Sequence, residues 1–159
     1  MCSSDLQLQD AVQAEDLVAD VLARMIEKIA AAAGPLAGKT AAVLGLSFKP
    51  ETDDIRESPA LAVVADLLAA GASVRAFDPA AMPATKAIHP GLHFATDAYD
   101  CADGADFLVL ATEWNAFRAL DLHRMAGLLR SKTMIDLRNV YDPKEMRAAG
   151  WAYTCVGRK

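Results

Sequence analysis

The sequence predicts an α/β fold, a doubly wound and mostly parallel sheet of about six strands, preceded by a long amphipathic helix. Three observations lead to this fold class. Short apolar runs alternate with helical patterns along most of the 159 residues, as strands joined by crossover helices do. Some of these runs are apolar throughout, which is typical of strands covered on both faces. Finally, 53% of the residues are hydrophobic but only 6% are aromatic, so Ala, Val, Leu and Ile must fill the core.

The first predicted element is an amphipathic helix within residues 7–35, with its clearest pattern from Asp10 to Ala33. Apolar residues between Leu17 and Ile29 recur at helical spacing on one face, opposite a charged face. Gly34-Pro35 ends the helix. Two interpretations remain open, because the apolar face needs a packing partner. The helix either folds back on its own domain or belongs to a linker or subunit interface.

Residues 36–159 are predicted to form the domain itself. Thr40–Leu46 is a continuous apolar run and predicts the first, buried strand. The helix Pro59–Ala70 follows, because Ser58 occupies the N-cap, proline the first helical position and Gly71 the position after the end. Its residues expected to face inward are Leu61, Val64, Leu67 and Leu68.

The remaining strands and helices follow in alternation. Right-handed crossovers between such strands produce a parallel, doubly wound sheet. The predicted strands are Ser73–Asp78, Leu92–Ala95, Phe107–Thr112, Thr133–Leu137 and Ala152–Val156. The predicted helices are Ala80–Ile88, Ala98–Gly104, Leu120–Leu129 and Pro143–Ala149.

Charge and cysteine usage narrow the class of partner. The net charge is −5 and there is no basic run, which argues against nucleic acid or an anionic membrane surface as the main partner. No apolar run approaches the roughly 20 residues that span a bilayer. The three cysteines, Cys2, Cys101 and Cys155, are widely scattered without metal-ligand spacing. They indicate free thiols in a reducing, cytoplasmic setting.

Residues 1–6 are interpreted as a non-native leader. Met1-Cys2-Ser3-Ser4-Asp5-Leu6 has no signal-peptide character. A sequencing adaptor, GTG-TGC-TCT-TCC-GAT-CT, encodes this stretch. We therefore expect that the chain begins where a sequencing read began.

Three segments are candidates for a binding site, because ligands of doubly wound sheets bind beyond the carboxyl ends of the strands. They are Ser47–Pro59 after the first strand, Glu113–Asn115 after the strand at Phe107, and Arg138-Asn139 after the strand at Thr133. All three are predicted to emerge at one edge of the domain.

The cations of these segments suggest a phosphorylated ligand. Lys49 and Arg56 lie beside the amino end of the helix that starts at Pro59, where free N–H groups favour an anion. Arg138 can reach the same region from another strand. The alternative is that Lys49 and Arg56 pair with the nearby carboxylates of Asp53, Asp54 and Glu57, or are simply solvated.

The dinucleotide fingerprint GxGxxG is absent after the first strand, where Gly45 is followed by Leu46-Ser47-Phe48-Lys49. This argues against a full NAD cradle at that turn. Asp78 occupies the position of a ribose-binding carboxylate, but a capping or turn role before Pro79 is the favoured interpretation.

The other reactive residue types give no catalytic or metal-binding pattern. Cys101 and Cys155 have no neighbouring histidine and are interpreted as structural. Trp114 is interpreted as a packing residue. The histidines, expected to be surface or loop residues, are His89, His93 and His123.

Four stretches carry a resemblance to a known family: Gly38–Ala60, Phe77-Asp78-Pro79, Ala111–Phe117 and Asp136–Pro143. In order and spacing they resemble the carboxyl-terminal, UDP-binding domain of the UDP-glucose/GDP-mannose dehydrogenases. The likeness extends from about residue 38 to the end of the chain. Lys49-Pro50 and Thr112-Glu113-Trp114 are more similar to the UDP-glucose branch than to the GDP-mannose or N-acetylmannosamine branches.

The resemblance implies a Rossmann-like domain of an enzyme that oxidises the sugar C6 alcohol twice, to a carboxylate, and passes two hydrides to NAD⁺. A cysteine nucleophile of the family holds the aldehyde stage as a thiohemiacetal. Family members combine an amino-terminal NAD-binding domain, a long central helix that forms the dimer, and this terminal domain. The helix at residues 7–35 would be the end of that central helix.

The resemblance also implies roles for individual residues. Phe48 and Lys49 would contact the UDP-sugar, Arg138 would grip its nucleotide portion, and Arg56 would reach toward the NAD. The glycine-rich NAD fingerprint and the family's Gly-Gly-x-Cys nucleophile motif are absent from the 159 residues. We therefore expect a fragment that lacks both and is inactive by itself.

Three functional hypotheses follow. The leading one is the nucleotide-sugar-binding domain of an enzyme that converts UDP-glucose to UDP-glucuronate and is a homodimer at full length. The alternative is a non-enzymatic Rossmann-like dimerisation or interaction module that works with a separate catalytic chain. A domain that binds NAD in its own right is disfavoured by the missing glycines.

Overall fold

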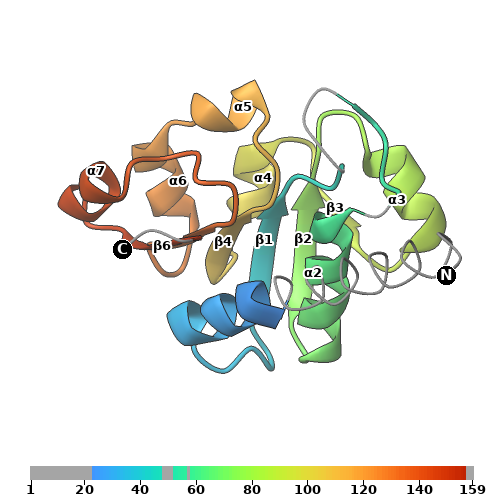
Figure 1. Cartoon of the computed structure of the whole chain (residues 1–159), viewed down its shortest axis with the longest axis horizontal. Coiled ribbons are helices and arrows are strands. Elements are labelled where there is room, and N and C mark those ends of the chain that lie inside the picture. Colours follow the sequence, from blue (N-terminus) through green and yellow to red (C-terminus); the bar gives the residue numbers. More distant parts are fainter. Residues whose placement is uncertain (1–22, 48–51, 57, 157–159) are drawn as a thin grey trace, which may run out of the picture.

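The computed structural model describes residues 23–47, 52–56 and 58–156. Phe48 and Lys49 lie outside this part of the chain, as do residues 7–22 of the predicted amino-terminal helix. The described residues form one sheet of six strands, in the order β3-β2-β1-β4-β5-β6. All neighbouring strands are parallel, so the predicted doubly wound α/β fold is confirmed (Figure 1).

The sheet is built around β1, and its strands are β1 (Thr40–Leu44), β2 (Ser73–Phe77), β3 (His93–Phe94), β4 (Phe107–Leu110), β5 (Thr133–Asp136) and β6 (Ala152–Cys155). Leu44 at the end of β1 is in register with Phe77 of β2 and Leu110 of β4. The carboxyl ends of the three central strands therefore meet at one edge of the sheet.

Alternate side chains of each central strand enter two separate cores, because successive side chains of a strand point to opposite faces. In β1, Ala41 and Val43 belong to one core, while Ala42 and Leu44 belong to the other. β1 is almost entirely apolar and β4 entirely so because helices cover both faces, as the sequence pattern indicates.

The helices divide between the two faces (Figure 1). The first core lies under α2 (Pro59–Ala69) and the start of α3 (Met82–Ile88), and the second lies under α4 (Ala98–Ala102), α5 (Asn115–Arg118), α6 (Leu122–Leu128) and α7 (Pro143–Ala148). This is the arrangement in which the strand order reverses once, between β1 and β4.

The amino-terminal helix is helical over residues 23–33, the part that the structure describes. Ile29 is fully buried in the first core, and Met25 and Ile26 pack against it. Lys28 Nζ donates a hydrogen bond of 2.8 Å to the carbonyl oxygen of Cys155 at the end of β6. This part therefore folds back on its own domain, and the interface role of the whole helix stays a prediction.

Every predicted strand is present, but each ends one or two residues earlier than predicted. The physical reason is that the chain stays buried for one or more residues after the last residue that pairs with a neighbouring strand. Leu46, Ala111 and Leu137 are buried without being part of a strand. In this region an apolar run therefore predicts which residues are buried, but not where the strand ends.

Two details of the predicted helices are wrong. The short helix α5 was not predicted, because its four residues are too few to show a periodic pattern. Leu68, predicted to face inward, is 40% exposed. The predicted N-cap of α2 at Ser58 is confirmed, although its side chain makes no capping hydrogen bond. Ser58 Oγ donates to the carbonyl oxygen of Leu46 at 2.8 Å and so joins α2 to the end of β1.

Candidate functional site

The candidate site lies at the switch point, where chain connections leave β1 and β4 in opposite directions along the sheet. In doubly wound sheets a crevice opens beyond the carboxyl ends of such strands, and ligands bind there. The described residues that follow these ends are Gly45–Ser47 after β1, Ala111–Trp114 after β4 and Leu137–Asn139 after β5. The sequence predicted these segments to share one edge, and for the described residues they do.

Gly45 and Thr112 form the floor of this edge. Gly45 has a φ of +104°, a conformation that L side chains rarely adopt. A Cβ at this position would lie 1.8 Å from Thr112 Oγ1 and 2.7 Å from the Thr112 backbone nitrogen. The backbones of the β1 and β4 loops thus lie so close together that only glycine fits at position 45.

Asp78 closes the β1 side of the edge and is fully engaged by the protein. Its Oδ2 accepts hydrogen bonds from the backbone N–H groups of Leu46 and Ser47, at 2.8 and 3.1 Å, and from Ser47 Oγ at 3.3 Å. Its Oδ1 accepts from the N–H groups of Ala80 and Ala81, both at 2.8 Å. Because both oxygens are used and the residue is buried, Asp78 organises the turn, as the favoured interpretation held.

The described residues of this edge do not fit NAD. Two features of an NAD-binding Rossmann domain are a glycine-rich turn and a free carboxylate for the ribose. Here the turn contains a single glycine, Gly45, and the carboxylate of Asp78 is occupied. We therefore assign no NAD contact to these residues.

Trp114 packs into the second core and is only 8% exposed. Its indole Nε1 donates to Ser47 Oγ at 3.3 Å, which links the β4 loop to the β1 loop. The interpretation of Trp114 as a packing residue is confirmed.

The β5 loop is held by a buried carboxylate that sequence reasoning missed. Asp136 Oδ2 accepts hydrogen bonds from the N–H groups of Val140 and Tyr141, at 2.7 and 3.0 Å, and from the Tyr153 hydroxyl at 2.6 Å. Its Oδ1 accepts from the N–H of Arg138 at 3.0 Å. An acidic residue at the end of an apolar strand, two residues before a candidate arginine, is the signal that was available.

Arg138 is therefore anchored at its backbone, and its side chain is anchored as well. Arg138 Nη2 donates to Glu113 Oε1 at 3.1 Å, and the other oxygen of Glu113 lies 3.5 Å from Arg118 Nη2. The Arg138 side chain remains 31% exposed. A guanidinium has five N–H donors in a planar fork, so one bond to Glu113 leaves donors for a ligand.

Of the other predicted site residues, the structure describes Arg56 but not Phe48 or Lys49. Arg56 is 87% exposed at its side chain and forms a two-pronged ion pair with Asp54, through Nε and Nη2 at 3.0 Å each. This is the carboxylate pairing that the sequence left open. The proximity of Lys49 to Arg138 stays a prediction, because residues 48–51 lie outside the described part.

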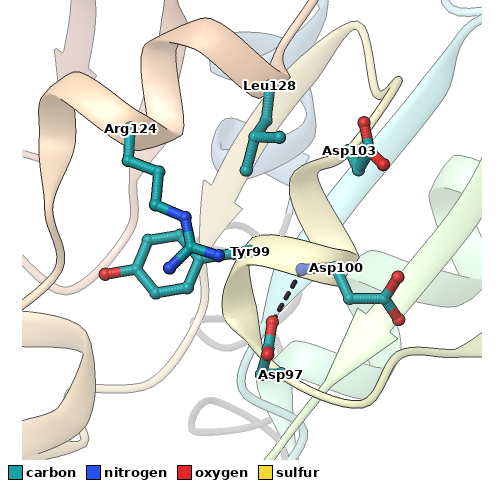
Figure 2. A pocket seen from close by; sticks show the side chains of 6 residues that line it. All are labelled: Asp97, Tyr99, Asp100, Asp103, Arg124 and Leu128. Carbon is teal, nitrogen blue, oxygen red and sulfur yellow. Dashed lines mark hydrogen bonds between the residues drawn. The ribbon is translucent and has the colours of Figure 1, made fainter.

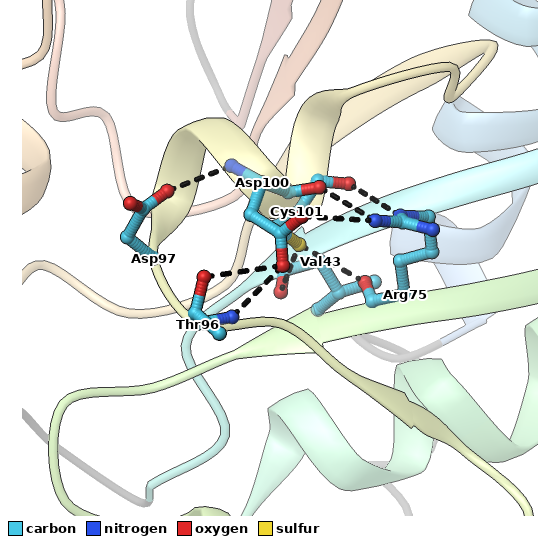
Figure 3. A network of polar contacts seen from close by, with 6 residues as sticks. All are labelled: Val43, Arg75, Thr96, Asp97, Asp100 and Cys101. Atoms are coloured by element: carbon cyan, nitrogen blue, oxygen red, sulfur yellow. Dashed lines mark hydrogen bonds and ion pairs between the residues drawn. The ribbon is translucent and has the colours of Figure 1, made fainter.

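Cys101 is structural (Figure 3). Its Sγ donates to the backbone carbonyl oxygens of Arg75 and Val43, at 3.3 and 3.7 Å. Arg75 in turn donates from Nε to the Cys101 carbonyl at 3.1 Å. Burial raises the pKa of the Cys101 thiol to about 12, so the thiolate that nucleophilic chemistry needs is suppressed. Cys155 is also buried.

Metal chemistry finds no site in the described residues, where no cluster of three or more His, Cys, Asp or Glu side chains could hold an ion. His93 and His123 are exposed and His89 is half-buried, as expected of surface and loop residues. Across residues 23–47, 52–56 and 58–156, no helix is both long and apolar enough to cross a bilayer.

A surface pocket of about 200 Å³ lies between α4 and α6, outside the switch point (Figure 2). Among the described residues that line it, the one cation is Arg124, whose guanidinium stacks over the ring of Tyr99, 3.9 Å from the ring centroid. Three carboxylates line the same pocket: Asp97, Asp100 and Asp103. Like charges repel, so this pocket does not suit a phosphate.

Comparison with known proteins agrees with the geometry. Residues 42–143 match the UDP-glucose/GDP-mannose dehydrogenase family, UDP binding domain. The chain is 48% identical over 130 residues to a UDP-glucose 6-dehydrogenase of Rhizobium meliloti (strain 1021), an alignment that covers 82% of this chain and 30% of that protein. The chain thus spans about a third of the length of the curated relatives that it matches.

Two solved structures share the fold. A UDP-glucose dehydrogenase from Pyrobaculum islandicum superposes with a TM-score of 0.69 at 30% identity, covering 84% of this chain and 29% of that one. An NDP-N-acetyl-D-galactosaminuronic acid dehydrogenase from Methanosarcina mazei Go1 superposes with a TM-score of 0.76 at 28% identity, covering 87% and 29%. With the switch-point geometry and the 102-residue match from 42 to 143, the chain belongs to the UDP-glucose/GDP-mannose dehydrogenase family, as its UDP binding domain.

Proposed function

We propose that this chain is the nucleotide-sugar-binding domain of an NAD-dependent UDP-glucose 6-dehydrogenase. The complete enzyme would oxidise UDP-glucose to UDP-glucuronate in two hydride transfers. NAD⁺ would accept the hydrides. It would be held mainly by another domain, since the described residues at the switch point do not fit it. The 48% identity to a UDP-glucose 6-dehydrogenase supports this substrate over the sugars of other branches.

The observation that carries the proposal is the double anchoring of Arg138 at the switch point. The buried carboxylate of Asp136 holds its backbone, and Glu113 holds one end of its guanidinium. An arginine restrained in this way loses little side-chain entropy when it binds a diphosphate, and it presents a planar fork that matches phosphate oxygens. The function of Arg138 would be to bind the nucleotide portion of the substrate.

Three further roles rest on the family resemblance. Phe48 and Lys49 would contact the UDP-sugar, and Arg56 would reach toward the NAD once its ion pair with Asp54 is exchanged. The full-length enzyme would be a homodimer through its central helix. By itself this chain would bind UDP and UDP-glucuronate without catalysing any reaction.

Calorimetry of the 159-residue chain with UDP and UDP-glucuronate tests the proposal. Arg138→Ala is expected to weaken the binding of both ligands by roughly tenfold or more, the range for a hydrogen bond to a charged group. Arg118→Ala is the matched control, because Arg118 pairs with the same carboxylate, Glu113, but is not assigned to the ligand. Its affinity for UDP is expected to stay within about twofold of the original chain.

Two results would contradict the proposal. One is no heat of binding with either ligand. The other is an equal loss of affinity in the two arginine variants, since that would implicate Glu113 rather than Arg138. Production of NADH from UDP-glucose and NAD⁺ by the isolated chain would contradict the expected inactivity.

A further inference from the structure

Thr112 carries a buried hydroxyl that makes no hydrogen bond within the described part of the fold. The residue is 1% exposed, and its Oγ1 has no hydrogen-bond partner among the residues that the structure describes. A buried hydroxyl without a partner costs stability, and such groups are rare enough in native proteins to need an explanation. A valine would fill the same volume without this cost.

The position of this hydroxyl points to a ligand. Thr112 follows β4 at the switch point, and its Oγ1 occupies the space where a side chain at position 45 would begin, 1.8 Å from an ideal Cβ. It directly precedes Glu113, which holds Arg138 at 3.1 Å. The unused hydroxyl and the anchored guanidinium therefore belong to the same loop cluster.

Neighbouring polar groups are already committed to one another. The N–H of Gly45 donates to Phe77, and Asp78 accepts from Leu46 and Ser47. Ser47 Oγ both donates to Asp78 and accepts from Trp114. Among the buried side-chain nitrogen and oxygen atoms of the described residues, Thr112 Oγ1 is the one without a hydrogen-bond partner.

We propose that the Thr112 hydroxyl is a ligand-binding group that donates a hydrogen bond to a phosphate oxygen of a nucleoside diphosphate. The inference rests on the proposed function and adds a residue to it. The hydroxyl would reach the ligand by rotation about the Cα–Cβ bond, and among the described residues this rotation breaks no hydrogen bond. The stability given up in the free domain is recovered when the phosphate binds.

Thr112→Val in the 159-residue chain separates this role from a structural one. The variant removes the hydroxyl and keeps the shape, so its melting temperature should equal or exceed that of the original chain. Its affinity for UDP, measured by calorimetry, should fall roughly tenfold or more, while Thr112→Ser should retain UDP binding to within about threefold. Competition with uridine should show no loss in Thr112→Val, because uridine lacks phosphate.

Each outcome decides the inference. Thr112→Val binding UDP within twofold of the original chain overturns it, and so does an equal loss of uridine and UDP. If the valine variant does not fold, Thr112→Ala replaces it under the same criteria. Failure of the original chain to bind UDP at all would instead overturn the proposed function, which keeps the two failures distinct.

Discussion

At the scale of single residues, two buried aspartates determine the loop conformations at the carboxyl edge of the sheet. Asp78 directly follows β2 and Asp136 ends β5, and both accept hydrogen bonds from several backbone N–H groups. Multiple donors to one buried carboxylate fix the loop that supplies them. The two aspartates therefore shape the β1 and β5 loops, and Asp136 also fixes the backbone of Arg138.

Gly45→Ala should be strongly destabilising. The added Cβ would lie 2.7 Å from the Thr112 backbone nitrogen at a φ of +104°, so the backbone must move. We expect a loss of about 3 kcal/mol or more in the free energy of unfolding, measured by urea denaturation.

Gly104→Ala is the control, because Gly104 also has a positive φ, +78°, but no atom lies within 4 Å of an added Cβ. Conformational strain alone predicts a loss of about 1 kcal/mol there. Equal losses in the two variants would show that contact with Thr112 contributes nothing.

At this scale the sequence patterns identified candidate site residues, but they did not predict which residues those candidates contact. Arg138 and Glu113 were both selected from their positions after strands, but their pairing was not predicted, and Asp136 was assigned no role. A carboxylate that is 25 positions away in the chain becomes a partner only when β4 and β5 lie side by side. Sequence spacing carries no record of that pairing.

At the scale of elements, the helix over residues 23–33 is part of the domain core. Ile29 is fully buried with α2 and the central strands in one cluster. An amphipathic pattern predicts that a face is buried, but it does not identify the surface that buries it. This is why the sequence left two interpretations of the helix open.

Ile29→Ala should reduce the free energy of unfolding by about 2–5 kcal/mol, the usual cost of truncating a fully buried aliphatic side chain. Glu27→Ala, on the exposed side of the same helix, should change it by less than about 0.5 kcal/mol. Thermal or urea denaturation measures both. Similar values for the two variants would mean that the helix does not pack on this domain in solution.

At the scale of the whole molecule, stability should fall in alkaline solution. Burial raises the pKa of the Cys101 thiol from 9.0 to about 12 and that of the Tyr141 phenol from 10.0 to about 12. The unfolded chain ionises both groups at lower pH than the folded one. Their protonation therefore stabilises the fold fully below pH 9, and this contribution is lost as the pH rises from 9 toward 12.

Urea midpoints measured between pH 7 and 10.5 test this expectation. The free energy of unfolding should decrease by about 1 kcal/mol or more per pH unit above pH 9. A variant carrying Cys101→Ala and Tyr141→Phe should show a flatter decline than the original chain. A midpoint that stays constant up to pH 10.5 would contradict the burial of these two groups.

The sequence by itself determined the alternation of strands and helices, the parallel sheet and the edge where the loops meet. It did so because hydrophobic periodicity and turn residues are local properties. Only the tertiary structure decided which carboxylate holds Arg138, why residue 45 must be glycine, and that the Thr112 hydroxyl has no partner among the described residues. These features depend on contacts between chain segments that are distant in sequence, and packing creates such contacts without leaving a local pattern.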